Sequence, residues 1–350
     1  MSNTPASSKL PNSELLIYDG RIYHTNIPLM IRSKKSTSKS YLPPRIFLVG
    51  DPARAYEVAK HFDTQSEPIL HREFIIIKGT CHGIEMAVAG TGIGTDNTEI
   101  IITELYAVYC YLLDYLQNHI WVNHDVQPIV IRLGTSGSPQ ADAPIGSLGI
   151  GSYSAGFDST GLFILDRPIE QFLAGNFEEI FYTPPGGDIC RAIWLAYKQL
   201  FVDCFPIPVI VPYVSAASPR VVQALNSACN LIETDNPALQ HFLGIVTASS
   251  GFFAGQGRKI GPKLSNILFP DMQEKLMTIN VSGLRPIINE MESSCLYRYC
   301  QVLGWQCGTI CLILANRAEG DLLTPEKYRQ GVDACIEAGL NAMVALSQKG

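Results

Sequence analysis

The chain has 350 residues, of which 47% are hydrophobic and 17% charged, an ordinary globular composition that can bury a sizeable core. Its net charge of -6 and isoelectric point near 5.7 argue against a dedicated nucleic-acid binder, which should show a basic face. Ten scattered cysteines, without a CxxC pair or a signal peptide, favour reduced, buried thiols in a cytoplasmic protein over disulfides or zinc ligands. The most apolar helix candidate, residues 98–116, contains three acidic residues, so it is expected in the core and not across a membrane.

Residues 1–42 are rich in Ser, Asn, Lys and Pro and contain only two short apolar islands. They predict a partly ordered extension, so the folded domain is expected to occupy residues 43–350. Within the extension His24 follows Tyr23, and taken alone it reads as a surface histidine.

The first predicted strand covers residues 44–49 and leads through Gly50 into an amphipathic helix that ends near residue 61. Two apolar runs, 75–78 and 84–89, are joined by a glycine-bearing connection and predict an antiparallel hairpin.

The glycine-rich segment 89–94 precedes a long predicted helix that ends near residue 117 and is capped by Asp96 or Asn97. It does not match GxGxxG, because the sixth position counted from Gly90 is Thr95. A dinucleotide site is therefore not predicted.

An apolar run over residues 130–133 predicts a buried strand that closes in a loop of glycines and hydroxyls over residues 134–137. Gly134 and Gly137 permit close approaches of the backbone. Together with Arg132, the N–H groups and hydroxyls of this loop favour an anion as the ligand, although a tight structural turn is the alternative.

The rest of the chain alternates between predicted helices and strands, without an internal repeat or a break in composition. The predicted elements are a bent strand over 145–152, a loop near 183–187, a helix over 189–200, a strand over 208–214, a helix over 219–228, a strand over 243–248, a helix opened by 289–293 and ending near 303, a strand over 308–315 and a helix over 325–347. This order predicts one domain of mixed α/β type.

The loop over residues 249–258 contains two phenylalanines, Gln256 and Arg258. An aromatic face with a planar amide and a guanidinium suits a flat heterocycle, whereas the alternative is a surface loop with two buried phenylalanines. Further on, Glu290 and Glu292 flank Met291 at a predicted helix start. Their carboxylates either complement the helix dipole or accept hydrogen bonds from sugar hydroxyls.

Taken together, these segments resemble the nucleoside phosphorylase family. The resemblance rests on five blocks in order, namely Gly50-Asp51-Pro52-x-Arg54, His71-Arg72-Glu73-Phe74, Ile131-Arg132-x-Gly134-Thr135-Ser136-Gly137, Phe252-Phe253-x-Gly255-Gln256-x-Arg258 and Glu290-Met291-Glu292-Ser293. It implies a mixed twisted β-sheet flanked by α-helices in a Rossmann-like three-layer sandwich. The Gln256-x-Arg258 pair and Asn316-Arg317 are similar to uridine phosphorylases. The tract Asn316-Arg317-x-Glu319-Gly320-Asp321 resembles the animal enzymes, which favours a dimer.

The resemblance also implies a role for individual residues. Phosphate would be bound by Gly50, Arg54, Arg132, Thr135 and, from the partner subunit, Arg72; ribose by Thr135, Met291, Glu292 and the partner's His24; and the base by Gly137, Phe252, Gln256, Arg258 and Arg317. Arg258, Gln256 and Glu292 would be the catalytic residues. A monovalent cation near Glu73 is the one metal to consider.

The implied reaction is the reversible phosphorolysis of uridine, with deoxyuridine or thymidine as further substrates, to uracil and the pentose 1-phosphate. Inorganic phosphate is the co-substrate, and neither a cofactor nor a covalent enzyme intermediate is required. Because His24 and Arg72 act across an interface, the expected assembly is a homodimer with shared sites. The protein is expected in the cytoplasm, without nucleic-acid or membrane partners.

Three segments depart from the usual family pattern. Ser138-Pro139 follows Gly137 in place of another small residue, Thr95-Asp96-Asn97 stands where a Pro-Ser pair is usual, and Ser147 replaces an acidic residue. Two alternatives therefore stay open. One is a weakened or inactive paralogue that binds nucleosides without turnover, and the other is a hydrolase of the same fold or a phosphorylase for another nucleoside.

Overall fold

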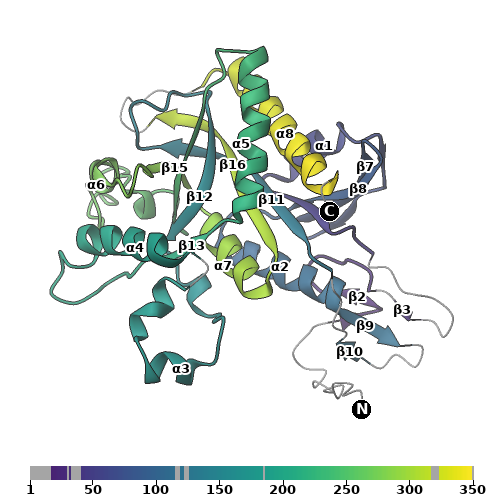
Figure 1. Ribbon diagram of the computed structural model, residues 1–350, viewed down its shortest axis with the longest axis horizontal. Coiled ribbons are helices and arrows are strands. Elements are labelled where there is room, and N and C mark those ends of the chain that lie inside the picture. The colour runs from purple at the N-terminus through teal and green to yellow at the C-terminus, as the bar shows by residue number, and fades with distance from the viewer. Residues whose placement is uncertain are drawn as a thin grey trace. The chain divides into compact units, whose positions relative to one another are not determined.

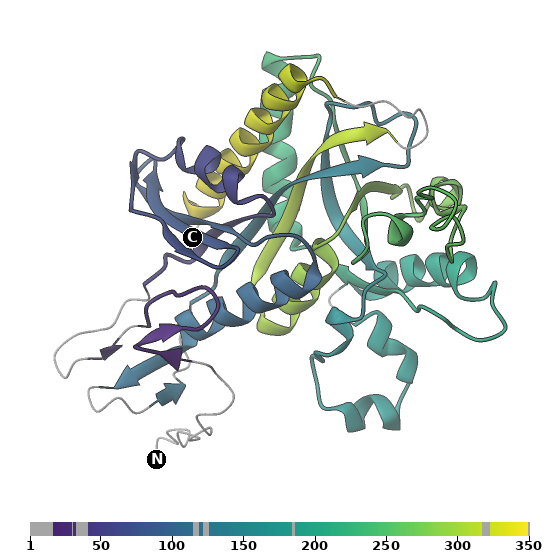
Figure 2. The ribbon, with the colours of Figure 1, turned by 180° about the vertical axis from the view of Figure 1, so that it is seen from behind.

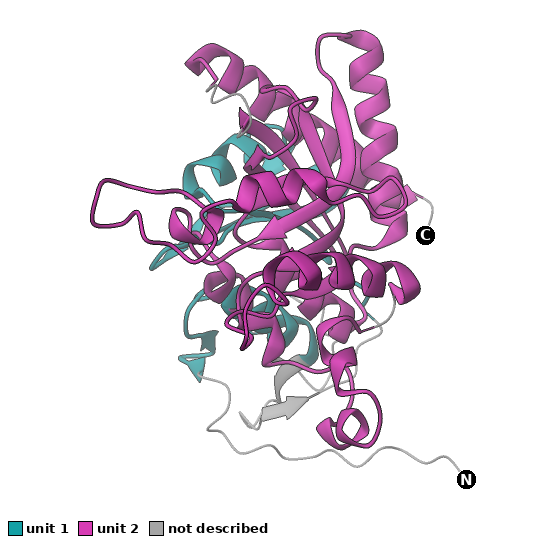
Figure 3. Cartoon of the chain, turned by 90° about the vertical axis from the view of Figure 1, so that its left-hand side faces the viewer, with its two compact units in different colours: residues 1–92, 100–128 teal, residues 93–99, 129–350 magenta. Residues whose placement is uncertain are grey.

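The computed structural model describes residues 17–29, 31–32, 41–114, 119–121, 126–183, 186–316 and 323–348. The chain forms two compact units (Figure 3). Unit 1 comprises residues 1–92 and 100–128, and unit 2 comprises residues 93–99 and 129–350. Each contains strands and helices, and the mixed α/β class predicted from the sequence is confirmed.

Unit 1 is built on a small mixed sheet. Its strands are β4 (Arg45–Val49), β5 (Thr64–Gln65), β6 (Ile69–His71), β7 (Phe74–Cys81) and β8 (Ile84–Gly90). β4 is parallel to β8, and β7 is antiparallel to β5, β6 and β8. Helix α1 (Pro52–Ala59) packs on β7 and β8. The predicted first strand and hairpin are thus confirmed.

The remaining strands of unit 1 are short. β1 (Ile17–Tyr18) pairs with β2 (Arg21–Ile22), while β9 (Tyr111–Asp114) pairs with both β3 (Ile31–Arg32) and β10 (His119–Trp121).

Helix α2 (Thr95–Cys110) ends earlier than its sequence predicts, because the chain passes directly into β9 after Cys110. The backbone of β9 is paired on both sides, and these pairings outweigh the local helix propensity that the apolar run carries. The capping prediction is also wrong, since the helix starts at Thr95 and both Asp96 and Asn97 lie within its first turn.

Five strands of unit 2 are paired in a closed ring. They are β11 (Ile129–Ser138), β12 (Leu148–Gly156), β14 (His241–Ala248), β15 (Pro286–Glu290) and β16 (Gln306–Asn316). The pairings run from β11 to β16, β12, β14 and β15, and β15 returns to β11 where Asn289 faces Gly137. A sixth strand, β13 (Tyr213–Ala216), adds to β12. Such closure leaves few exposed strand edges.

Helices cover both faces of this sheet. Consecutive residues of a strand point to opposite faces. Accordingly Gly308 lies against Val221 of α5 (Pro219–Asp235), whereas the next residue, Thr309, bonds to Ser293 at the start of α7 (Ser293–Leu303), with 2.9 Å between the two hydroxyl oxygens. Helix α8 (Pro325–Gln348) lies beside α5 (Figures 1 and 2).

Helix α4 (Gly187–Phe201) packs on β12 and β13, and short helices complete the unit. They are α3 (Ile169–Ala174), α6 (Met272–Thr278) and the 3₁₀ turns Thr160–Leu162, Phe177–Phe181 and Ala254–Gln256.

Strand β11 continues through the segment that was predicted as a loop. Gly134 and Thr135 face Cys311 and Leu312 of β16, and the pairing continues to Ser138 with one irregularity after Ser136. The loop prediction is therefore wrong, because the parallel ladder with β16 satisfies a backbone whose glycines and hydroxyls locally favour a turn. Likewise the segment 289–293, predicted to open a helix, begins as the end of β15 and enters α7 only at Ser293.

All ten cysteines are free, and eight of them are buried, as predicted; Cys110 is half-buried and Cys204 is exposed. Within the described part of the chain, none of the helices combines the length and the apolar character needed to cross a membrane.

Candidate active site

A buried cluster of one arginine and two carboxylates lies at the end of the ring in unit 2. Arg132 comes from β11, Glu290 ends β15, and Glu292 immediately precedes α7. The Nε atom of Arg132 is 3.4 Å from Oε2 of Glu290, and its Nη2 atom donates to Oε2 of Glu292. All three residues are at most 6% exposed, so these charges interact at low effective dielectric.

Backbone N–H groups hold both carboxylates in place. Gly94 donates to Oε1 of Glu292 over 2.9 Å, which joins the start of α2 to the acidic segment. Oε1 of Glu290 accepts from the N–H of Ser293 over 2.9 Å, and its Oε2 accepts from the N–H of Glu292 over 3.1 Å. Glu290 thereby occupies the amino end of α7, where N–H groups that have no partner within the helix favour a negative charge.

The two carboxyls differ in how readily they bind a proton. Burial raises the pKa of Glu290 to about 7, with a further upward contribution from Glu292, although Arg132 opposes the shift. Burial also acts to raise the pKa of Glu292, but Arg132 and the Gly94 N–H outweigh it and the pKa is lowered. For Arg132, burial is outweighed by Glu292 and Glu290, which raise its pKa. Glu292 is therefore the stable anion, and Glu290 is the carboxyl that protonates first.

Gly134 is required by the path of the Arg132 side chain. A Cβ atom at position 134 would collide with Nη1 of Arg132 and would lie 2.7 Å from Sγ of Cys311. Nη1 also donates to that sulfur over 3.5 Å. Gly134 thus allows the Arg132 guanidinium to approach the backbone closely, and it does not form the turn that the sequence suggests.

Beyond Gly134 the strand presents two hydroxyls. Thr135 is half-buried, whereas Ser136 is buried and its hydroxyl has no hydrogen-bond partner among the described residues. Gly137 faces Asn289 of β15.

The departures Ser138 and Pro139 are buried at the start of a turn that Asn316 stabilises. Asn316 donates to the carbonyls of Gln140 and Ala143 over 3.1 and 3.2 Å.

The predicted base-binding loop follows β14, and it starts beside the acidic segment because the N–H of Ser249 donates to the Glu290 carbonyl over 3.1 Å. The guanidinium carbon of Arg258 lies 4.3 Å from the ring centre of Phe252 and 4.9 Å from that of Phe253. Phe252 and Phe253 are 45% and 50% exposed. The structure therefore brings Arg258 and Phe252 together on an open aromatic surface, while Gln256 is buried.

In unit 1, Gly50 directly follows β4, and Asp51 caps α1 by accepting from the N–H of Ala53 over 2.9 Å. Arg54 is buried in the first turn of that helix, with 8% of its surface exposed.

The two residues expected to act across an interface lie in one cluster of unit 1. The guanidinium carbon of Arg72 lies 4.6 Å from the ring centre of Tyr23, whose ring meets that of His24 edge-to-face at 4.9 Å. His24 is in turn bonded to Glu104, with 2.8 Å between Nδ1 and Oε1. The sequence did not predict that Glu104 belongs to this cluster. The one indication was its position as a carboxylate in the middle of an apolar helix.

Three predictions concern other positions. Arg317 lies outside the described residues. Met291 is half-buried, and its N–H donates to Oε2 of Glu292 over 3.3 Å. Glu73 is exposed, and the described residues contain no group of three His, Cys, Asp or Glu side chains able to hold a metal ion.

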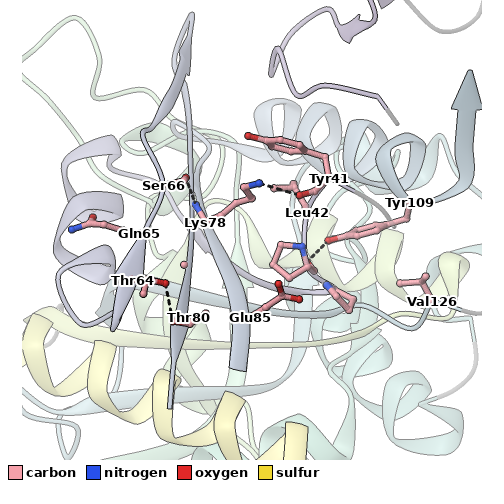
Figure 4. A pocket seen from close by; sticks show the side chains of 13 residues that line it. Tyr41, Leu42, Thr64, Gln65, Ser66, Lys78, Thr80, Glu85, Tyr109 and Val126 are labelled. Carbon is pink, nitrogen blue, oxygen red and sulfur yellow. Dashed lines mark hydrogen bonds between the residues drawn. The ribbon is translucent and has the colours of Figure 1, made fainter. Parts of the chain in front are cut away.

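Each unit also contains a cavity that is separate from these residues. In unit 1 a cavity of about 610 Å³ is bordered by Lys78, whose Nζ lies 3.6 Å from the ring centre of Tyr41, and by Tyr109, whose hydroxyl donates to the Pro43 carbonyl (Figure 4). A cavity of about 700 Å³ in unit 2 is bordered by Ser152 and Trp305. None of the predicted site residues that the structure describes lines either cavity.

Comparison with known proteins identifies the family. The model of the phosphorylase superfamily matches residues 44–345. The uridine phosphorylase of Thermococcus kodakarensis is 25% identical over 276 residues, covering 79% of this chain and 74% of that protein. The enzyme of the same name from Haemophilus influenzae is 22% identical over 300 residues, covering 85% and 90%.

Among solved structures, the nucleoside phosphorylase of Trypanosoma brucei, which shows uridine phosphorylase activity, superposes with a TM-score of 0.78 at 25% identity. The match covers 95% of this chain and 100% of that one. The chain therefore belongs to the phosphorylase superfamily and is a nucleoside phosphorylase.

Proposed function

We propose that the protein is a uridine phosphorylase that converts uridine and inorganic phosphate to uracil and ribose 1-phosphate. The observation that carries the proposal is the buried Arg132–Glu292 pair, whose acidic segment is bonded through the Glu290 carbonyl to the start of the loop that carries Phe252 and Arg258. It supplies a cation for phosphate, a carboxylate for sugar hydroxyls and an aromatic face with a guanidinium for a planar base. The uridine phosphorylases among its relatives support uracil as that base.

In the proposed reaction a phosphate oxygen forms a bond to C1′ while the bond from C1′ to the base breaks. The electrons of the breaking bond pass to the uracil ring, and the sugar develops positive charge. Arg258 stabilises the departing anion, and Gln256 orients the ring, with Arg317 assisting and Gly137 allowing the base to approach. Stabilising charge that appears only in the transition state accelerates the reaction.

The substrates would be held by the remaining predicted residues. Glu292 and the Met291 backbone bind ribose hydroxyls next to Thr135. Phosphate is bound by Gly50, Arg54, Arg132 and Thr135 of one protomer and by the partner's Arg72, so that guanidinium groups offset the dianion.

We further propose a homodimer in which His24 and Arg72 of each protomer complete the site of the other. The observation in favour is that both residues lie in one cluster with Tyr23. A stable monomer at working concentration, seen by light scattering, would contradict this assembly.

The deciding experiment is a steady-state assay of uridine, deoxyuridine, thymidine and inosine, with and without phosphate. Phosphate-dependent release of uracil, with uridine or deoxyuridine preferred, is the expected result. Uracil release without phosphate would indicate a hydrolase, and preferred cleavage of inosine would indicate a purine enzyme. Calorimetric binding of uridine without product after long incubation would indicate an inactive paralogue.

A further inference from the structure

Glu104 is a buried carboxylate whose two oxygens are both bonded to one short segment. Oε1 accepts from the backbone N–H of His24 over 3.0 Å and lies 2.8 Å from its ring Nδ1, while Oε2 accepts from the N–H of Thr25 over 2.8 Å. The residue is 5% exposed. Because an unpaired buried carboxylate is costly, these three contacts account for its position inside an apolar helix.

This arrangement decides which nitrogen of His24 carries the proton. An ionised carboxylate has no proton to donate, so Nδ1 must be the donor in its contact with Glu104. A neutral imidazole protonated at Nδ1 has a lone pair at Nε2 and can only accept there. The side chain of His24 is 30% exposed, and none of the described residues is bonded to Nε2.

Two further contacts hold the ring and its backbone. His71 donates from Nδ1 to the carbonyl oxygen of His24 over 2.8 Å, and the Tyr23 ring meets the His24 ring edge-to-face. Since Arg72 stacks on the same Tyr23 ring, the orientation of His24 and that of Arg72 are set within one protomer.

We propose that Glu104 is a positioning residue that fixes His24 in the Nδ1–H tautomer, so that Nε2 accepts a hydrogen bond from the 5′-hydroxyl of the nucleoside in the partner's site. This inference rests on the proposed function. Its new element is Glu104, which lies outside the predicted site residues and acts on the substrate only through His24.

The test compares kcat/KM for uridine and for 5′-deoxyuridine, which lacks the donor. The wild type is expected to prefer uridine by about tenfold, the effect of one hydrogen bond of about 1.4 kcal/mol. Glu104→Gln should bring this ratio close to one, because an NH₂ group in place of Oε1 can only donate to Nδ1, which moves the imidazole proton to Nε2 and removes the acceptor there. Turnover of 5′-deoxyuridine should change little.

The matched control is Glu99→Gln on the same helix. Glu99 contacts the Tyr299 hydroxyl over 3.4 Å and should keep the wild-type ratio. His24→Ala should abolish the preference, and adding Glu104→Gln to it should change the ratio no further, since the two residues act as one unit. A wild-type ratio in Glu104→Gln, or an additional loss in the double variant, would overturn the proposal.

A measurement on the wild type covers the case in which Glu104→Gln does not fold. Imidazole nitrogen NMR in mildly alkaline buffer, assigned with His24→Asn, should show His24 protonated at Nδ1. A resonance pattern with the proton on Nε2 refutes the role of Glu104 while leaving the phosphorylase proposal intact. Conversely, failure of the wild type to release uracil from uridine and phosphate refutes the proposed function itself.

Discussion

Arg132 and Glu292 form a buried ion pair that joins β11 to the start of α7. The residue proposed for phosphate and the residue proposed for ribose therefore hold each other in position before either substrate binds. Binding of a dianionic phosphate at Arg132 must then compete with two carboxylates already in contact with it, Glu292 and Glu290.

This pairing predicts how stability responds to mutation. Arg132→Leu should cost about 3–5 kcal/mol of unfolding free energy, because it leaves two buried carboxylates without their cation. Adding Glu292→Gln should restore part of that loss, since one uncompensated charge is removed, while activity stays absent. Urea unfolding of both variants measures the difference, and a double variant less stable than Arg132→Leu alone would contradict this view.

Arg258→Ala should behave in the opposite way. Its guanidinium stacks on half-exposed rings and carries no ion pair that the structure describes, so the melting temperature should stay near that of the wild type. Loss of one preorganised charge donor is expected to reduce kcat by about 10² to 10³. A near-normal kcat/KM for uridine would remove Arg258 from the proposed mechanism.

Arg72 occupies a backbone conformation that favours glycine, with φ of 54° at the turn between β6 and β7. Arg72→Gly should therefore leave stability unchanged or raise it by up to about 1 kcal/mol while raising KM for phosphate, because a cation of the site is lost. His82→Gly is the matched control, with φ of 50° in the β7–β8 turn and no proposed role. An equal rise in the phosphate KM of His82→Gly would assign the effect to the backbone.

Glu290 predicts a pH dependence of stability. Its folded-state pKa of about 7 lies above the ordinary 4.5, so between these values the folded protein keeps a proton that the unfolded chain releases. Stability should accordingly fall as the pH rises through this interval. Glu290→Gln should flatten the slope, which denaturant unfolding at a series of pH values measures; an unchanged slope would place its origin elsewhere.

Local sequence patterns were sufficient to predict the elements whose boundaries coincide with changes in composition. The strand β4, the β7–β8 hairpin and helix α8 follow from apolar runs bounded by turn residues, and the family blocks supplied the candidate residues. A short apolar stretch was also enough to place β16 within two residues at its start and one at its end.

The tertiary structure decided the other elements and the contacts of the site, because segments distant in sequence supply the free energy that stabilises them. The pairing with β16 makes residues 134–137 a strand, and the pairings of β9 end α2 at Cys110. The sequence made Arg132 and Glu292 candidates for one site, but their ion pair forms only when the chain brings together two positions that are 160 residues apart in sequence. Glu104 and His24 also meet only in the folded chain. A carboxylate in an apolar helix needs a partner, because an unpaired buried charge is costly, but only the fold decides that the partner is His24.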